Sequence, residues 1–232
     1  MPSTEPLPRV ESDPYDQASW RYSQVYSTPE DEAESRVIFG IAEKEVGFGT
    51  LVDVGCGDGI ALNYISGCDY VGVDPSRPMI YHARKLHPGH TFEVGTLESV
   101  PDMVADFVLG AFGPLIHIEP YEVLAFAKEV ERVLWPGRKF LVMAATRGVV
   151  RATGEPRVTH TSKMLTKEFV SAGLLRVRVR GFGRRRGVTP SEGGRFPRRL
   201  WQLQKAVSLR AGWLLPDSHE WLVVTGAKAS RT

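Results

Sequence analysis

The sequence predicts an α/β fold built on a doubly wound, mostly parallel sheet. Short and almost wholly apolar runs recur along the chain, as is typical of strands that are covered on both faces. Helix-like segments separate these runs, and a glycine-rich turn follows the first of them. The chain has 232 residues, of which 42% are hydrophobic and 24% charged, so it is long enough for a full hydrophobic core.

The N-terminal part is expected to hold a tail, an aromatic segment and a helix. Residues 1–14 contain four prolines and few large apolar side chains, which predicts a flexible tail. Residues 15–26 are dense in aromatic side chains. A helix should then begin after Thr28, which fits the N-cap, with Pro29 in its first turn, and should end at Gly47.

From residue 51 onward, strand-like runs and helix-like segments alternate. The expected strands are 51–54, 70–73, 91–94, 106–109, 140–143, 174–179 and 221–225, and the expected helices are 59–65, 78–86, 120–134 and 165–172. A Gly- and Arg-rich loop and an amphipathic helix, 197–210, separate the last two strands. We therefore divide the chain into a tail 1–14, an N-terminal lid and helix 15–48, a ligand-binding core 49–182, an Arg-rich cap insertion 183–216, and a final strand and tail 217–232.

Composition argues against several classes of protein. No apolar stretch approaches the ~20 residues of a membrane helix, and the N-terminus lacks the basic start and apolar core of a signal peptide. The two cysteines, Cys56 and Cys68, do not belong to a cluster with metal-ligand spacing. We therefore expect a cytoplasmic protein without membrane or metal.

The turn after the first strand carries the main ligand signal. It reads Asp-Val-Gly-Cys-Gly-Asp-Gly from Asp53 to Gly59, and Asp74 closes the next strand. Ligands of open parallel sheets bind at the strand ends beside the first strand, where a carboxylate can accept hydrogen bonds from ribose hydroxyls. Ile60 breaks the dinucleotide pattern, and no Gly-Lys-Ser/Thr follows, so a ribose-containing ligand is favoured over a pyrophosphate. Cys56 is expected to fill the tight turn rather than act as a nucleophile.

Five segments in order resemble the class I S-adenosylmethionine-dependent methyltransferases. They are LVDVGCGDG, VGVDPSRPMIYHA, FEVGTLESVP, ADFVLGAFGPLIHI and VERVLWPGRKFLV, which together cover about residues 51–143. The resemblance implies a Rossmann-like sheet of seven strands with an antiparallel C-terminal strand, and S-adenosylmethionine as the cofactor. It places Asp53, Gly55, Cys56 and Gly57 at the methionine end, Asp74 at the ribose diol, Ser76 and Met79 near the adenine or its sugar, Thr96 and Leu97 beside the adenine, and Gly110 and Ala111 beneath the sulfonium.

The catalytic and acceptor-binding groups are less clearly marked. His117, after the fourth strand, is the candidate general base, although it could instead begin the next helix; His160 and His219 are isolated in the sequence. The candidate acceptor-binding residues are Tyr15, Trp20, Tyr22 and Tyr26 in the N-terminal lid and Arg184 and Arg185 in the insertion.

Three functions remain open at this point. The first is methyl transfer to O or N of a small metabolite, anionic acceptors included. The second is methyl transfer to RNA or DNA, because residues 176–210 carry ten Arg and one Lys against one acid, a net charge of +10. The loop after the fourth strand lacks the Asp/Asn-Pro-Pro-Tyr/Phe pattern of base methylation, which favours the small acceptor. The third is cofactor binding without turnover. The amphipathic helix 197–210 would suit packing on the body or on a second subunit, as in a homodimer.

Overall fold

The computed structural model describes residues 28–146, 154, 156–185, 207, 212 and 216–230. The helices are α3 (Pro29–Val46), α4 (Arg77–Leu86), α5 (Val123–Val133) and α6 (Ser162–Ser171), with short 3-10 helices η2 (Ile60–Asn63), η3 (Leu97–Ser99), η4 (Pro114–Ile116) and η5 (Pro216–Ser218). The strands are β1 (Thr50–Val54), β2 (Asp69–Asp74), β3 (Thr91–Val94), β4 (Ala105–Gly110), β5 (Leu134–Ala145), β6 (Leu175–Arg185) and β7 (His219–Ala227).

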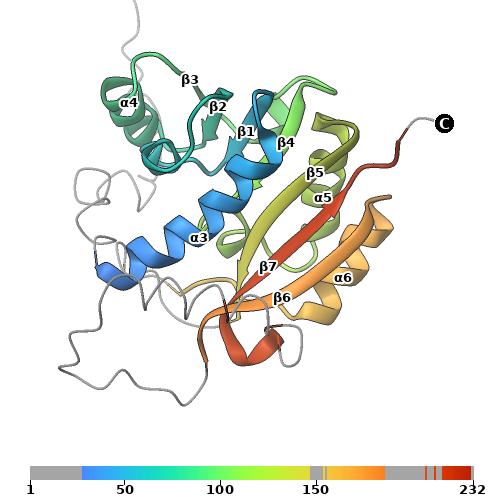
Figure 1. Ribbon diagram of the computed structural model, residues 1–232. Coiled ribbons are helices and arrows are strands. Elements are labelled where there is room, and N and C mark those ends of the chain that lie inside the picture. The colour runs from blue at the N-terminus through green and yellow to red at the C-terminus, as the bar shows by residue number, and fades with distance from the viewer. Residues whose placement is uncertain are drawn as a thin grey trace, which may run out of the picture.

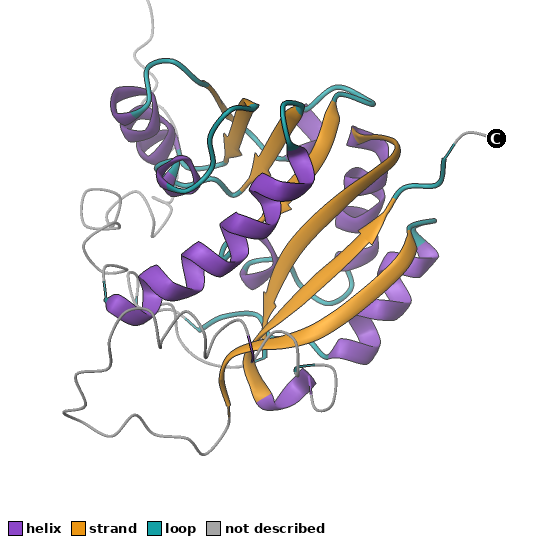
Figure 2. Ribbon diagram, viewed as in Figure 1, coloured by secondary structure: helices purple, strands orange, loops and turns teal. Residues whose placement is uncertain are grey.

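The strands form one seven-stranded sheet in the order β3-β2-β1-β4-β5-β7-β6. β1 to β5 pair in parallel, and β7 lies antiparallel between β5 and β6. The predicted doubly wound sheet with an antiparallel C-terminal strand is confirmed. α3 crosses one face of the sheet, and α5 and α6 cover the opposite face (Figures 1 and 2).

The first described helix, α3, begins and ends where the sequence predicts. The Thr28 side chain accepts a hydrogen bond from the Asp31 backbone N–H, and the Asp31 side chain accepts one from the Thr28 backbone N–H. Such a reciprocal capping box satisfies two free donors of the first turn. Gly47 ends the helix with a φ of 59°, a conformation that other residues seldom adopt.

Some boundaries differ from the predictions. The expected helix 59–65 is only the 3-10 turn η2, because Gly59 enters it with a φ of 82° and the chain must reach β2 by residue 69. β6 continues to Arg185, so the first three residues of the predicted insertion 183–216 extend a sheet strand. The predicted amphipathic helix 197–210 lies outside the described residues apart from residue 207. Among the described helices, none has the length and apolar character needed to cross a membrane.

Candidate functional site

The candidate site lies at the carboxyl ends of β1, β2 and β4, where the winding of the sheet reverses. β1 pairs with β2 on one side and with β4 on the other, so the chain moves first toward one edge of the sheet and then toward the other. Open parallel sheets bind ligands outside the strand ends at such a switch point. The sequence places its glycine turn and Asp74 at this point.

Glycines with positive φ shape the turn after β1. Gly55, Gly57 and Gly59 have φ values of 67°, 56° and 82°. The backbone N–H groups of Gly55 and Cys56 both donate to the carbonyl oxygen of Val73, at 2.8 and 3.2 Å. The turn is therefore tied to the end of β2, and its backbone is free of side chains at the glycine positions.

Asp74 joins the two strand ends. Its Oδ2 accepts a hydrogen bond from the N–H of Gly57 at 2.9 Å, and its Oδ1 accepts one from the N–H of Ser76 at 2.9 Å. The side chain is half-buried. Each carboxylate oxygen can accept more than one hydrogen bond, so this group fits the two hydroxyls of a ribose. The glycine turn and the acid that we expect to bind a ribose are therefore side by side.

The loop after β4, residues 111–118, packs directly on the glycine turn. A Cβ added to Gly55 would stand 3.1 Å from Cδ of Pro114, and one added to Gly110 would stand 2.9 Å from its Cγ. A Cβ at Gly113 would meet the carbonyl oxygen of Gly55 at 3.1 Å. The close approach of the loop to the turn therefore depends on three positions without a side chain.

Asp53 is buried below the turn and paired with a tyrosine. Its Oδ2 accepts a hydrogen bond from the hydroxyl of Tyr70 at 2.6 Å. Burial raises the pKa of Asp53 to about 7; the hydrogen bond from Tyr70 opposes this rise, and the charge of Asp74 adds to it. Asp53 thus changes its charge near neutral pH.

Cys56 contributes packing at this turn. Its Sγ faces Gly72 of β2, where an added Cβ would stand 2.8 Å from the sulfur. The side chain is buried, and burial raises the pKa of the Cys56 thiol. A buried thiol that keeps its proton is a poor nucleophile, so the contacts agree with a residue that fills the tight turn.

The residues expected near the adenine divide into buried and exposed ones. Ser76 is the N-cap of α4, and its side chain accepts a hydrogen bond from the N–H of Met79 at 3.4 Å. Both side chains are buried, as is Leu97 in η3. Thr96 immediately precedes η3 and is exposed. Their roles toward the adenine stay predictions, as does the place of half-buried Ala111 beneath the sulfonium.

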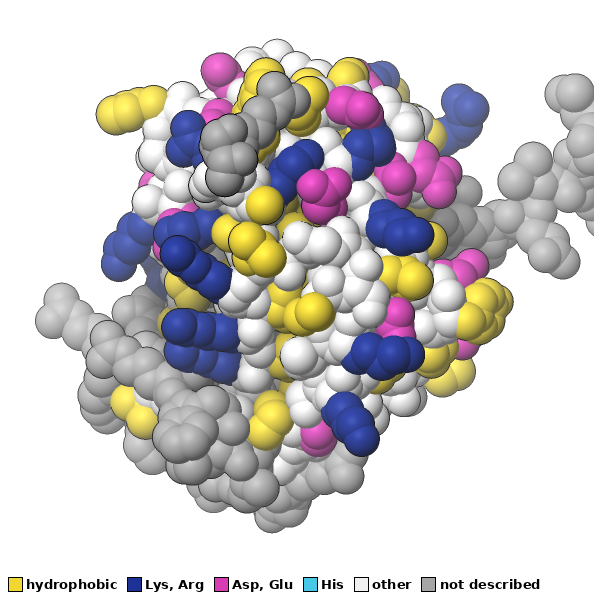
Figure 3. Space-filling model, turned by 90° about the vertical axis from the view of Figure 1, so that its right-hand side faces the viewer, with side chains coloured by type: hydrophobic (Ala, Val, Ile, Leu, Met, Phe, Trp, Pro, Cys, Tyr) yellow, Lys and Arg dark blue, Asp and Glu magenta, His cyan; other side chains and the backbone are white. Residues whose placement is uncertain are grey.

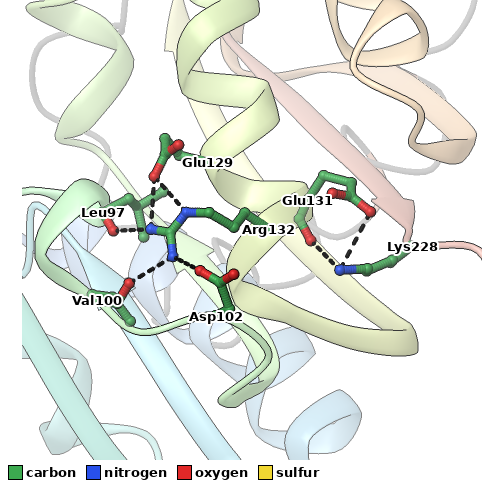
Figure 4. A network of polar contacts seen from close by, with 7 residues as sticks. All are labelled: Leu97, Val100, Asp102, Glu129, Glu131, Arg132 and Lys228. Carbon is green, nitrogen blue, oxygen red and sulfur yellow. Dashed lines mark hydrogen bonds and ion pairs between the residues drawn. The ribbon is translucent and has the colours of Figure 1, made fainter.

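Arg132 of α5 holds the segment after β3 (Figure 4). Its guanidinium donates to the carbonyl oxygens of Leu97 and Val100, each at 2.8 Å, and pairs with Asp102 and Glu129. The segment expected beside the adenine is therefore fixed by a residue more than thirty positions away. Sequence reasoning missed Arg132, because only its spacing to Glu129 is visible locally.

Aromatic side chains lie on the other side of the loop after β4. The Phe112 ring centroid is 5.5 Å from that of Trp221 in β7 and 6.0 Å from that of Phe39 in α3. The guanidinium of Arg157 lies over the Trp221 ring at 4.3 Å and pairs with Glu220 at 3.1 Å. Phe39 and Trp221 are buried in the core, and Phe112 is half-buried against them; the sequence analysis did not predict these contacts.

Two histidines flank the same loop. His117 is exposed, and its backbone N–H donates to the carbonyl oxygen of Pro114 at 3.2 Å. Because α5 begins only at Val123, His117 does not begin the next helix. His160, isolated in the sequence, is buried with its Nε2 at 2.7 Å from the carbonyl oxygen of Leu115. No local pattern signals this contact, because it joins residues 45 positions apart.

The remaining candidate residues lie outside the described residues or have no described side chains. Tyr15, Trp20, Tyr22 and Tyr26 lie outside the described residues, and the side chains of Arg184 and Arg185 are not described although their backbone belongs to β6. Within the described ranges, no group of three or more His, Cys, Asp or Glu side chains is arranged to hold a metal ion.

Comparisons with known proteins agree with this geometry. Residues 51–137 match a family model described as "Methyltransferase domain". No curated protein matches the chain significantly in sequence. Its fold is similar to that of a Thermotoga maritima protein described as an S-adenosylmethionine-dependent methyltransferase and possible histamine N-methyltransferase, with a TM-score of 0.60 and 19% identity over 93% of this chain and 98% of that one.

Two further structures share the fold. Haemonchus contortus phosphoethanolamine N-methyltransferase 2, in complex with phosphomonomethylethanolamine and S-adenosylhomocysteine, has a TM-score of 0.66 and 15% identity over 97% of this chain and 62% of that one. The cyclase SpnF has a TM-score of 0.63 and 19% identity over 94% of each chain. The matched segment contains the glycine turn, Asp74 and the loop after β4. Residues 51–137 therefore match a methyltransferase domain, and the chain shares its fold with structures described as S-adenosylmethionine-dependent methyltransferases.

Proposed function

We propose that the protein transfers the methyl group to an oxygen or nitrogen of a small metabolite. The observation that supports this proposal is the half-buried ring of Phe112, two residues after Gly110, which packs on the buried rings of Trp221 and Phe39. Aromatic rings at this place would exclude water and contact a small acceptor over a limited area. The phosphomonomethylethanolamine complex of the Haemonchus enzyme is a precedent for a small acceptor on this fold.

The chain's own residues would bind and orient the reactants. Bound S-adenosylmethionine supplies an activated methyl group on a sulfonium with a neutral leaving group. Asp74 would accept hydrogen bonds from the ribose, while the backbone at Gly55 and Gly57 would border the methionine end of the cofactor. Alignment of the acceptor with the methyl group, and exclusion of water, then account for several kcal/mol of the barrier.

An acceptor that arrives protonated needs a base, and we propose His117 for this role. The residue lies on the loop that follows β4, and an imidazole titrates near neutral pH. His117→Ala should slow methyl transfer at least tenfold while leaving the affinity for S-adenosylhomocysteine unchanged. Equal rates of the variant and the parent protein between about pH 6 and about pH 9 would contradict the assignment.

A nucleic-acid acceptor is the second candidate, because arginines lie along the edge of the sheet. β6 is the edge strand, and Arg176 and Arg178 on it are exposed without an ion pair to any described residue. On the face shown in Figure 3, Lys and Arg side chains are spread over both sides and are interspersed with Asp and Glu side chains. A charged edge strand also protects a sheet against pairing with other chains, so this surface has a second explanation.

Two measurements separate the candidates. The purified protein should methylate members of a panel of small amines, phenols, carboxylates and phosphate esters, detected as S-adenosylhomocysteine formed. It should pass through a column of immobilised RNA or DNA at ~0.15 M salt, because binding through phosphates would retain it in a salt-dependent manner. Retention that is lost when Arg184 and Arg185 become Ser would favour nucleic acid. Cofactor binding without transfer to any panel member would favour a protein without methyl-transfer turnover.

A further inference from the structure

The short segment from Arg157 to His160 contacts the loop after β4 through two hydrogen bonds. The N–H of Val158 donates to the carbonyl oxygen of Ile116 at 2.9 Å, and the His160 ring nitrogen Nε2 lies 2.7 Å from the carbonyl oxygen of Leu115. His160 is itself fixed to the sheet, because its N–H donates to the carbonyl oxygen of Ala145 at 2.9 Å. The segment therefore joins the end of β5 to the loop.

The hydrogen bond between His160 and Leu115 has only one possible direction. A carbonyl oxygen only accepts hydrogen bonds, so Nε2 must carry the proton and donate to Leu115. Nδ1 is buried and has no hydrogen-bond partner among the described residues. Desolvation by burial lowers the pKa of His160, in accord with a neutral ring. The ring acts as a fixed donor in the interior.

The loop that receives this bond is strained. Phe112 has a φ of 59°, a left-handed conformation that is unfavourable for a residue with a side chain. Strain of this kind persists only where the surrounding contacts hold the backbone in place. Phe112 is held by Trp221, whose ring in turn packs on Arg157, so the segment supports the loop at a second point.

The position of the loop decides how much space remains at the glycine turn. Leu115 follows Pro114, whose ring would lie 3.1 Å from a Cβ at Gly55 and 2.9 Å from one at Gly110. A small outward movement of Leu115 would therefore shift Pro114 away from both glycines. Those two glycines are the positions expected at the methionine end and beneath the sulfonium of the cofactor.

We propose that His160 is a positioning residue for methyl transfer: its ring holds the loop after β4 against the glycine turn and so sets the geometry of the reactive end of the cofactor site. His160 acts through Leu115 and Pro114, without contact to the acceptor. The proposal does not depend on which class of acceptor the enzyme uses.

The test compares three substitutions in the full chain. His160→Gln keeps a donor, because its amide nitrogen stands as many bonds from Cα as Nε2 does. His160→Leu removes the donor and keeps the bulk. Leu174→Ala, a substitution of a buried residue just before β6, controls for a general loss of stability. The measurements are the melting temperature, amide hydrogen exchange in peptides that cover the loop 111–118, and calorimetric affinity for S-adenosylhomocysteine.

His160→Leu should accelerate exchange in the loop at least tenfold and weaken S-adenosylhomocysteine binding at least threefold, and His160→Gln should restore both to near parental values. Leu174→Ala should lower the melting temperature without either effect. If His160→Leu does not fold, His160→Asn replaces it, because its shorter amide cannot reach Leu115. Equal behaviour of the donor-keeping and donor-lacking variants, or a lower melting temperature with unchanged loop exchange and affinity, would overturn the proposal.

Discussion

The buried carboxyl group of Asp53 should make the stability of the protein depend on pH near neutrality. Its pKa rises from 3.8 to about 7 on folding. A group whose pKa is raised in the folded state contributes fully to the free energy of unfolding when the pH is below its unfolded pKa. This contribution is lost as the pH rises through its pKa in the folded state. Over the whole interval, a shift of ~3 pKa units corresponds to about 4 kcal/mol.

Within a practical range the expected loss is smaller. Between about pH 5.5 and about pH 8, the linkage relation gives a loss of about 2 kcal/mol from Asp53. Asp53→Asn keeps an oxygen that can accept the hydrogen bond from Tyr70 but has no charge to bury. The difference in unfolding free energy between the variant and the parent protein should therefore move by about 2 kcal/mol in favour of the variant over this range.

Urea unfolding of the cofactor-free protein, followed by tryptophan fluorescence at four or more pH values, measures this difference. Other groups that titrate in the range, such as His160, are present in both proteins and cancel. Asp69→Asn, exposed at the other end of β2, is the matched control and should leave the profile unchanged. Parallel stability profiles of Asp53→Asn and the parent protein would refute the reasoning.

Three further predictions concern the turn and its surroundings. Asp74→Asn should weaken S-adenosylhomocysteine binding, measured by calorimetry, about 10- to 100-fold. An amide has one accepting oxygen, whereas the carboxylate accepts hydrogen bonds from two backbone N–H groups and would also accept them from the ribose. The control Asp69→Asn should leave this affinity unchanged. Gly110→Ala should lower the free energy of unfolding, measured by urea unfolding, by about 1–3 kcal/mol, since the new Cβ would stand 2.9 Å from Pro114. The control is Gly40→Ala in α3, where the new Cβ meets nothing within 4 Å. In the same assay this control should be neutral or stabilising by up to about 1 kcal/mol. In the native protein a thiol reagent should modify half-buried Cys68 much faster than buried Cys56. Comparable rates of modification of the two thiols would contradict the packing role of Cys56.

Local sequence patterns predicted the framework of this protein because they report on local physics. Alternating apolar runs and helix-like segments predicted the doubly wound sheet, and Thr28 and Gly47 marked the ends of α3 correctly. The spacing from the glycine turn to Asp74 predicted a contact between the ends of two strands. A parallel crossover returns the chain to the start of the next strand, and that strand then ends at the same edge of the sheet as the first.

The tertiary structure alone brought together residues that are far apart in the chain. Arg132 with Leu97, Arg157 with Trp221 and His160 with Leu115 meet only because the order of strands places the ends of β4, β5 and β7 side by side and α5 next to η3. No periodicity or spacing encodes such pairs, because contacts between distant segments depend on packing of the whole sheet and its helices. The sequence by itself therefore determined the fold and the place of the glycine turn and Asp74, while packing decided which side chains support the loop after β4.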